Sequence, residues 1–275
     1  MRLVALMENT TTDERLTCAH GLSVYIETPL HRILMDTGPN EAFAENAHEI
    51  GIDLALVDVA VLSHGHFDHA GGIARFCQEN ATAPLYVHAQ AAGPHYAARA
   101  DGSFEYIGMS EEALSYKDRF ITTGDICTID SEITLFSVIP TADLLSSSNK
   151  SLLIKQGEDM VCDPFLHEQN LIVNAEGKRI LVSGCAHRGI VNIMRAAEEI
   201  AGAPLDAVIG GFHLSNPGLG GSEPQELVDA VADELAARNA RYFTGHCTGS
   251  VAWERLKERL GDQIDYLATG TDVTL

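Results

Sequence analysis

The chain has 275 residues, of which 45% are hydrophobic and 21% charged, so it can bury a sizeable core and disorder is not expected. Lysine and arginine number 18 against 39 aspartates and glutamates, and the formal charge of −21 argues against nucleic acid or an anionic membrane as a partner. The six cysteines contain no C-x-x-C pair, and we find neither a secretory signal nor an apolar run of about 18 residues. We therefore expect reduced thiols and a cytoplasmic location.

The first third of the chain predicts strands separated by turns. Its short apolar and β-branched runs are typical of strands, and the turn at 36–40 offers Asn40 as the N-cap of a helix that extends to Ile50. A second helix is expected at 71–78. The strands are expected at 3–7, 22–27, 32–35, 56–62 and 85–88.

The segment from about 94 to 150 has no clear period. It contains Gly102, Gly108 and Gly124, and it ends near a polar run at 146–149. We expect an insertion with its own short elements, and a lid over a site is one interpretation of it.

The rest of the chain begins with grouped strands, including a hairpin with its turn at 176–178, and then alternates helices with strands. This order indicates sheets covered by helices, so we expect one α/β domain over residues 1–275. The strands are expected at 151–155, 170–174, 179–183, 207–209, 241–244 and 264–268, and the helices at 190–200, 224–238 and 251–260.

Four potential metal ligands follow the predicted strand at 56–62 within six residues. His64 and His66 lie two apart, so an extended backbone points both to one side, and Asp68 and His69 come where the chain turns towards a helix. Neutral imidazole suits zinc, iron and nickel. A polar loop with histidines by coincidence would not explain this density and order of ligands, so the segment predicts a metal site.

With this segment the sequence resembles the metallo-β-lactamase superfamily, whose hallmark is the H-x-H-x-D-H pattern seen at 64–69. Asp36-Thr37-Gly38 matches the D-x-G that precedes the pattern in that family. More closely, the chain resembles the branch of metal-dependent hydrolases related to 7,8-dihydropterin-6-yl-methyl-4-(β-D-ribofuranosyl)aminobenzene 5'-phosphate synthase. The pieces that carry this likeness lie at 8–10, 20–23, 62–66, 184–187, 210–214 and 244–247.

The resemblance implies an αββα sandwich, with two mixed β-sheets packed face to face, helices on both outer faces and metals at one edge. By position, His64 and His66 are expected to hold a first metal ion. Asp68, His69 and His246 are expected to hold a second. Two zinc ions are the expected cofactor, with iron or manganese as alternatives.

The middle ligands depart from the family pattern. Cys185 stands where a bridging aspartate is usual, and His187 lies two residues beyond it. We infer that His187 supplies the missing ligand to the first metal, with His167 as an alternative. Cys185 is either a thiolate ligand or a small residue packed beneath the site. One tight and one weak metal site therefore remains an alternative to two equal ones.

Several other polar residues are candidates for the same cavity. His213 follows the predicted strand at 207–209 and could donate a proton, reach substrate or bind metal, unless it is simply a hydrogen-bonded loop residue. Asn9 and His20 could line the cavity or orient ligands, or only form local turns. We expect the remaining histidines to be structural or at the surface, namely His31, His48, His88 and His95.

The expected reaction is hydrolysis of an ester, lactone, amide or phosphodiester bond in a small molecule. A metal ion lowers the pKa of bound water from about 15.7 towards 7, which provides hydroxide as the nucleophile. We expect Asp68 to orient this water and His213 to protonate the leaving group. The alternatives are a pterin-related phosphate synthase, an iron-dependent oxidoreductase of the same fold and a non-catalytic ligand-binding protein; the oligomeric state stays open.

Overall fold

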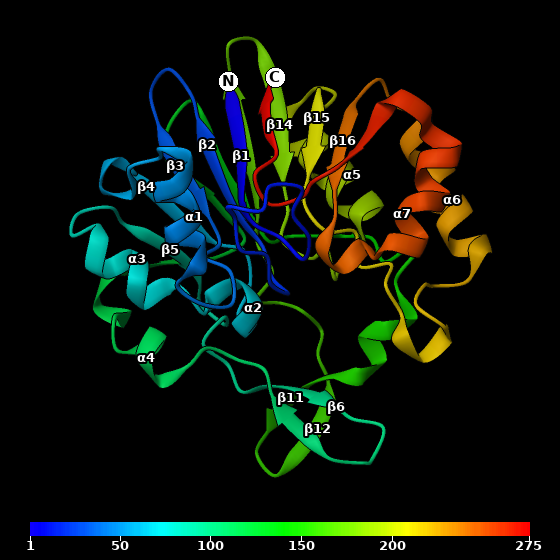
Figure 1. The fold of residues 1–275 in the computed structure, drawn as a ribbon. Coiled ribbons are helices and arrows are strands. Elements are labelled where there is room, and N and C mark those ends of the chain that lie inside the picture. The colour runs from blue at the N-terminus through cyan, green and yellow to red at the C-terminus, as the bar shows by residue number, and fades with distance from the viewer.

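The computed structural model describes residues 1–275, apart from the side chain of Leu219. Two seven-stranded sheets form the centre of the molecule (Figure 1). The first sheet contains β1 (Arg2–Met7), β2 (Ser23–Glu27), β3 (Arg32–Met35), β4 (Val59–Leu62), β5 (Leu85–His88), β8 (Phe120–Thr123) and β18 (Asp272–Thr274). In the order β18-β1-β2-β3-β4-β5-β8, the pairs from β18 to β3 are antiparallel and those from β3 to β8 are parallel.

The second sheet is also mixed. It contains β9 (Ile126–Thr128), β10 (Ile133–Phe136), β13 (Asn170–Ala175), β14 (Lys178–Val182), β15 (Ala207–Ile209), β16 (Arg241–Thr244) and β17 (Ile264–Tyr266). Its order is β17-β16-β15-β14-β13-β10-β9, with parallel pairing from β14 to β17. A two-residue turn joins β13 to β14, and its Glu176 and Gly177 both have positive φ, of 53° and 73°, which confirms the predicted hairpin.

Helices cover the outer faces of both sheets. One apolar core packs α1, α3 and α4 against the first sheet, a second packs α5, α6 and α7 against the second sheet, and a third fills the space between the sheets. The αββα sandwich of two mixed sheets is therefore confirmed. The helices are α1 (Ala42–Ile50), α2 (Phe67–Ala70), α3 (Ile73–Glu79), α4 (Glu111–Leu114), α5 (Ile190–Ala201), α6 (Gln225–Ala236) and α7 (Ser250–Leu260).

Two helix boundaries follow from local chemistry. Helix α1 ends where Gly51 takes the left-handed conformation, with φ of 83°, and its amide donates to the carbonyls of Ala47 and His48. At the other end the Asn40 side chain accepts from the amide of Ala42 at 3.0 Å; Glu41, which stands at the N-cap position next to the predicted Asn40, makes no side-chain capping hydrogen bond.

The range predicted as an insertion is divided between different parts of the fold. Strands β8, β9 and β10 from this range belong to the two large sheets. A separate four-stranded antiparallel sheet takes β6 (His95–Ala98) and β7 (Phe104–Tyr106) from the range and β11 (Leu152–Gln156) and β12 (Asp159–Cys162) from beyond it. This small sheet stands off from the sandwich at the bottom of Figure 1. Its action as a lid stays a prediction.

Among the described residues, no helix combines the length and the apolar composition that a membrane crossing requires.

Candidate metal centre

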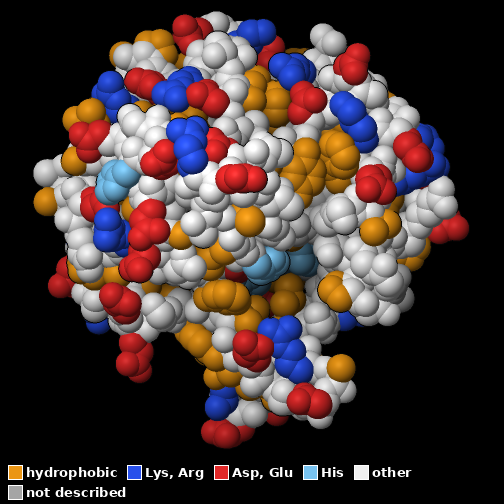
Figure 2. All heavy atoms as spheres, viewed as in Figure 1, with side chains coloured by type: hydrophobic (Ala, Val, Ile, Leu, Met, Phe, Trp, Pro, Cys, Tyr) orange, Lys and Arg blue, Asp and Glu red, His pale blue; other side chains and the backbone are white. Residues whose placement is uncertain are grey.

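The predicted ligands meet because the strands that carry them end at one edge of the sandwich. The H-x-H-x-D-H segment follows β4, Cys185 and His187 follow β14, and His246 follows β16. Loops at the carboxyl ends of parallel strands are where α/β proteins form ligand sites. Here they surround a cavity of about 640 Å³ lined by, among others, His66, Asp68, Cys185, His187, His213 and His246. Figure 2 shows histidines at the bottom of a hollow on this face, above the small sheet.

Four donor atoms lie within 4.8 Å of one another at one side of this cavity. His69 Nε2 lies 3.2 Å from both His246 Nε2 and Cys185 Sγ, and Cys185 Sγ lies 3.4 Å from His246 Nε2. Asp68 Oδ2 completes the set at 3.3 Å from His246 Nε2 and 3.6 Å from His69 Nε2. Tetrahedral zinc, with bonds of about 2.0–2.1 Å to nitrogen, keeps neighbouring donors about 3.3–3.4 Å apart. The spacing of these four atoms therefore fits a single ion.

The hydrogen bonds behind the two imidazoles explain why their Nε2 atoms are free to bind an ion. His69 Nδ1 donates to Asp36 Oδ2 at 2.6 Å, and His246 Nδ1 donates to Asn9 Oδ1 at 2.9 Å. In the neutral rings each Nε2 then carries only a lone pair. Two lone pairs facing each other at 3.2 Å repel unless a cation lies between them. Burial lowers the pKa of His69, but the Asp36 and Asp68 carboxylates outweigh burial and raise the pKa to about 9, so without an ion a proton takes the place of the cation between the two Nε2 atoms.

A second group of imidazoles lies beside the first. The Nε2 atoms of His64, His66 and His187 are all buried and have no hydrogen-bond partner. The His64 and His66 ring centroids are 4.6 Å apart, and each is 5.0 Å from that of His187. Burial lowers the pKa of all three histidines well below the usual value, which keeps them in the neutral form that ligates metal.

The same tautomer argument applies to this group. Ser63 Oγ donates to Asp36 Oδ2 at 2.6 Å, so it must accept from His64 Nδ1 at 2.8 Å. His187 Nδ1 donates to Asn149 Oδ1 at 3.2 Å. Both rings therefore direct a free lone pair on Nε2 into the site, which is the form that a metal ion requires.

Cys185 lies between the two groups. Its Sγ falls within 4.8 Å of donor atoms of His64 and His187 on one side, and of the Asp68, His69 and His246 set on the other. Burial raises the pKa of the Cys185 thiol. A coordinated cation deprotonates such a thiol, so the position suits a ligand shared by two ions. Of the two sequence-based interpretations of Cys185, this geometry favours the ligand.

Buried carboxylates hold the loops that carry these ligands. Asp36 accepts from both the amide and the hydroxyl of Ser63. Glu8 accepts from the backbone amide of His246. Glu168 accepts from the backbone amides of His187 and Arg188. Burial raises the pKa of Glu168 to about 7, although both amide hydrogen bonds act in the opposite direction. Asp36, the aspartate of the D-x-G motif, therefore orients the candidate ligand His69 and, through Ser63, the candidate ligand His64.

The remaining candidates also surround the cavity. His213 Nε2 lies 3.1 Å from Ser148 Oγ, its Nδ1 has no partner, and its backbone is in the left-handed region with φ of 49°. Asn9 joins His20 to His246 by hydrogen bonds, and His20 Nε2 lies 3.5 Å from Asp68 Oδ2. His167, the alternative first-metal ligand, groups instead with His66, His95 and Asp163.

Sequence reasoning gave Asp163, Glu8 and Glu168 no role at the site and expected His95 to be structural. All four are buried polar residues close to the ligand loops. The sequence does contain a group of potential ligands in this region, because Asp163, His167 and Glu168 fall within six residues after β12. Nothing in the sequence connected that stretch to the histidine segment about one hundred residues earlier.

Comparison with known proteins agrees with this fold. The model of the Metallo-beta-lactamase superfamily matches residues 16–142. The chain is 28% identical over 274 residues to the 7,8-dihydropterin-6-methyl-4-(beta-D-ribofuranosyl)-aminobenzene-5'-phosphate synthase of Methanocaldococcus jannaschii, covering 91% of this chain and 88% of the relative. The crystal structure of Tm1679, named a metal-dependent hydrolase of the beta-lactamase superfamily, superposes with a TM-score of 0.81 at 25% identity, over 100% of this chain and 99% of Tm1679. Zinc-bound PqqB from Methylobacterium extorquens, at 14% identity, a TM-score of 0.57 and full coverage of both chains, shares the fold alone.

The chain has the metallo-β-lactamase fold, and residues 16–142 match the model of the Metallo-beta-lactamase superfamily. Within it, the chain resembles the branch that contains the dihydropterin-related phosphate synthase, as the sequence motifs indicated. Members of this superfamily generally bind metal ions, and the clusters of histidine, aspartate and cysteine described here are of the kind that does so.

Proposed function

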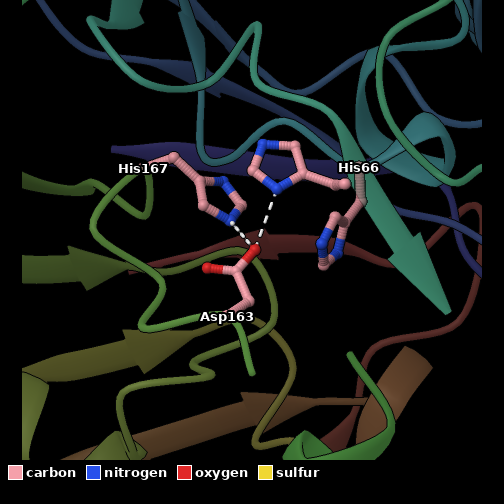
Figure 3. Close-up of side chains that lie close together, drawn as sticks. His66, Asp163 and His167 are labelled. Atoms are coloured by element: carbon pink, nitrogen blue, oxygen red, sulfur yellow. Dashed lines mark hydrogen bonds and ion pairs between the residues drawn. The ribbon is translucent and has the colours of Figure 1, made fainter. Parts of the chain in front are cut away.

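We propose that the protein is a metal-dependent hydrolase of a small molecule, with a two-ion centre at the base of the cavity. The observation that carries this proposal is the convergence of free imidazole Nε2 atoms, one carboxylate and one thiol on two adjoining positions. His64 and His187 would hold the first ion together with His66, whose ring centroid lies 4.6 Å from that of His64 although one of its nitrogens groups with His95, Asp163 and His167 (Figure 3). Asp68, His69 and His246 would hold the second, and Cys185 lies where it could serve both.

Bound divalent ions would supply Lewis acidity and would lower the pKa of water at the site from about 15.7 towards 7. The chain's own residues supply the rest. Asp68 Oδ2 faces the cavity and lies 3.5 Å from His20 Nε2, so it can orient a water molecule and accept a proton. His213 also lines the cavity, where its unpartnered Nδ1 can give a proton to the departing alcohol, amine or phosphate oxygen.

The cavity volume of about 640 Å³ suits a small-molecule substrate. Serine hydroxyls, Arg99 and apolar side chains such as Phe67 and Ile107 share its wall. This mixture supports an ester, lactone, amide or phosphodiester with both a polar and an apolar part.

The direct test measures turnover and metal content together. Generic esters, lactones, amides and phosphodiesters are screened with protein loaded with zinc, manganese or iron. His66→Ala and Asp68→Ala should lose metal and turnover in parallel, because each removes a donor. His48→Ala, at an exposed histidine of α1, is the matched control and should retain both. Full turnover in either site variant would refute the proposal.

A variant at His213 separates chemistry from metal binding. If this histidine protonates the leaving group, His213→Gln should lower kcat by about 10²–10⁴-fold while the metal content stays the same. Parallel loss of metal would instead make His213 a ligand, which its position near Cys185 and Cys247 also allows.

A second candidate follows from one of the relatives. The 28% identity to a protein named a phosphate synthase supports a synthase that acts on a related pterin and ribofuranosyl-aminobenzene phosphate. This candidate predicts saturable binding of 7,8-dihydropterins or of ribofuranosyl-aminobenzene phosphates by calorimetry. A hydrolase of unrelated esters would bind neither.

A further inference from the structure

A buried carboxylate, Glu223, joins two segments beside the cavity. Glu223 lies just before α6 and is only 3% exposed. It accepts from the hydroxyls of Ser146 and Ser147, at 2.8 and 2.9 Å. It also accepts from the Ser148 amide at 3.0 Å and from the Asn216 side chain at 2.8 Å. Residues 146–148 stand where the chain passes from β10 of the sandwich to β11 of the small sheet (Figure 1). The proposed reaction gives Glu223 no role.

The surroundings of Glu223 keep its carboxylate ionised. Burial raises the pKa of Glu223, but hydrogen bonds from Asn216, Ser146 and Ser147 outweigh burial and leave the pKa below its usual value. An ionised carboxylate has no proton to donate, so the hydroxyl proton of Ser146 points at Glu223 Oε1. Because a hydroxyl has a single proton, Ser146 Oγ can only accept from its other partners.

The directions of the hydrogen bonds are then fixed as far as His213. Ser146 Oγ lies 2.7 Å from Ser148 Oγ, so Ser148 donates its hydroxyl proton to Ser146. Ser148 Oγ also lies 3.1 Å from His213 Nε2, and with its own proton used it can only accept there. His213 therefore carries a proton on Nε2. In the neutral ring His213 Nδ1 has only a lone pair, and this atom is buried without a hydrogen-bond partner.

The backbone holds the two ends of this chain of hydrogen bonds close together. The Glu223 amide donates to the carbonyl of Leu214, the residue after His213, at 2.9 Å. His213 itself has a left-handed backbone with φ of 49°, which is costly for a residue that carries a side chain. Such conformations persist where the surrounding contacts fix them, and they are frequent at functional sites. Here the conformation places the His213 ring at the cavity, 4.2 Å between centroids from the ring of His187.

We propose that Glu223, Ser146 and Ser148 are positioning residues that act through His213, and that Nδ1 is the reactive atom of this histidine. The two hydroxyls keep the ring proton on Nε2 and leave the Nδ1 lone pair free. The carboxylate at the far end of the chain stabilises the positive charge that the ring gains when Nδ1 takes a proton. A carboxylate that sets the tautomer of a catalytic imidazole acts in the same way in other hydrolases.

This arrangement sets the order of proton transfers in the proposed hydrolysis, on which the catalytic part of the inference rests. A neutral ring protonated on Nε2 can give a proton from Nδ1 only after it has taken one there. Nδ1 accepts the proton that the attacking water loses as the water oxygen bonds to the substrate. It passes this proton to the leaving oxygen or nitrogen as that bond breaks. The Nε2 proton stays in place, and the ring ends the turnover neutral.

Long-range proton–nitrogen correlation spectra of ¹⁵N-histidine-labelled, metal-free protein test the proton positions, at a pH where His213 is neutral. The expected result is a single tautomer of His213, protonated on Nε2. Ser148→Ala removes the acceptor and should give a mixture of both tautomers. Ser147→Ala is the matched control, because Ser147 bonds the same carboxylate but lies outside the chain to His213, and it should keep the wild-type tautomer.

Two results of these spectra would overturn the proposal. One is wild-type His213 protonated on Nδ1, and the other is an unchanged tautomer in Ser148→Ala. The spectra need neither substrate nor metal, so they decide the proton positions even if the proposed hydrolase activity is never found.

Steady-state kinetics on a substrate of the metal-loaded protein give the second readout. Glu223→Gln keeps an oxygen that accepts from Ser146 but removes the charge, so it should keep the Nε2 tautomer and lower kcat. The expected loss is about 10–100-fold, smaller than that of His213→Gln, with KM and metal content unchanged. Ser148→Thr retains the hydroxyl and should keep most of the turnover that Ser148→Ala loses, and Ser147→Ala should have the wild-type kcat. An unchanged kcat in Glu223→Gln, or a change in its KM alone, would contradict the proposal.

Discussion

Cys185 is the residue that most distinguishes this site. It occupies the place in the loop after β14 where a bridging aspartate is usual in the superfamily, and the structure puts its Sγ within reach of both donor groups. A thiolate is a softer ligand than a carboxylate and favours zinc or iron over magnesium and calcium. As a ligand of the proposed centre, Cys185 would therefore bias the site towards such a metal.

Cobalt can report this ligand directly. Cobalt-loaded wild-type protein should show a near-ultraviolet thiolate-to-cobalt charge-transfer band, because Cys185 Sγ lies 3.2 Å from His69 Nε2 and 3.4 Å from His246 Nε2. Cys185→Ser should lose that band, and Cys18→Ser, at an exposed cysteine, should keep it. An unchanged band in Cys185→Ser would exclude this thiol as a ligand.

The candidate ligands could be predicted from the sequence because four of them fall within one six-residue segment. The residues that orient them could not be. His95 and Asp163 are 68 positions apart, and His31, expected at the surface, bridges Asp58 and Asp130 with a side chain only 18% exposed. Such pairings depend on how distant strands meet, which no local pattern encodes.

At the scale of elements, long or strongly apolar segments matched prediction best. Strands β3, β5, β15 and β16 have the expected bounds, and most other predicted elements differ by one or two residues. Strands β12 and β18 were not predicted, the strand at 56–62 begins only at Val59, and the segment 120–136 was missed because short and partly exposed strands such as β9 have no clear alternation. Strand β8 pairs with β5 and strand β10 pairs with β13, so these segments become strands through tertiary contacts rather than through their local sequence.

The sharp turn after β4 leaves no room for a side chain. A Cβ at Gly65 would lie 1.9 Å from the carbonyl oxygen of Ala91. Gly65→Ala should lower the free energy of unfolding by about 1–3 kcal/mol, through forced backbone movement, and should also weaken metal binding. Denaturant unfolding of the metal-free protein measures the first effect. Gly124→Ala, where the added Cβ would meet open space, should stay within about 0.5 kcal/mol of wild type; equal stability of the two variants would contradict this packing.

His31 should make the stability of the molecule depend on pH. It links the turn before β3 to Asp58 ahead of β4, at 3.1 Å, and to Asp130 in the turn between β9 and β10, at 2.6 Å. Burial lowers the pKa of His31, but these hydrogen bonds raise it above the usual value overall. The bridge therefore contributes fully below about pH 6.5, while both aspartates are ionised, and is lost as pH rises through the raised pKa.

Unfolding of His31→Gln across pH checks this sign. Its loss of stability relative to wild type should be largest on the acid side of neutrality and should shrink in alkali. His48→Gln, at an exposed histidine, serves as control. A deficit that grows with rising pH would contradict the bridge.

For the whole molecule, the metal centre should connect the two halves of the sandwich. The donor groups come from loops of both sheets, so an ion bound there ties β4 to β14 and β16. Ligand present at 100 times its Kd stabilises the native state by about 2.7 kcal/mol. For a chain near this size, each kcal/mol of stabilisation raises Tm by about 2–4 °C. Zinc should therefore raise Tm by roughly 5–11 °C relative to protein kept metal-free with a chelator. The same Tm with and without zinc would mean that no ion binds the native state, and His246→Ala should show a reduced shift.

The central claim is that imidazoles, a carboxylate and a thiol from distant strand ends converge to hold two ions. Anomalous diffraction at the zinc and iron edges, on crystals of metal-loaded protein, tests it most directly. The account predicts two peaks in the cavity, one within bonding distance of Asp68, His69 and His246 and the other of His64, His66 and His187, with Cys185 Sγ between them. A well-ordered structure with no anomalous peak in this cavity, or with the only ion elsewhere, would contradict it.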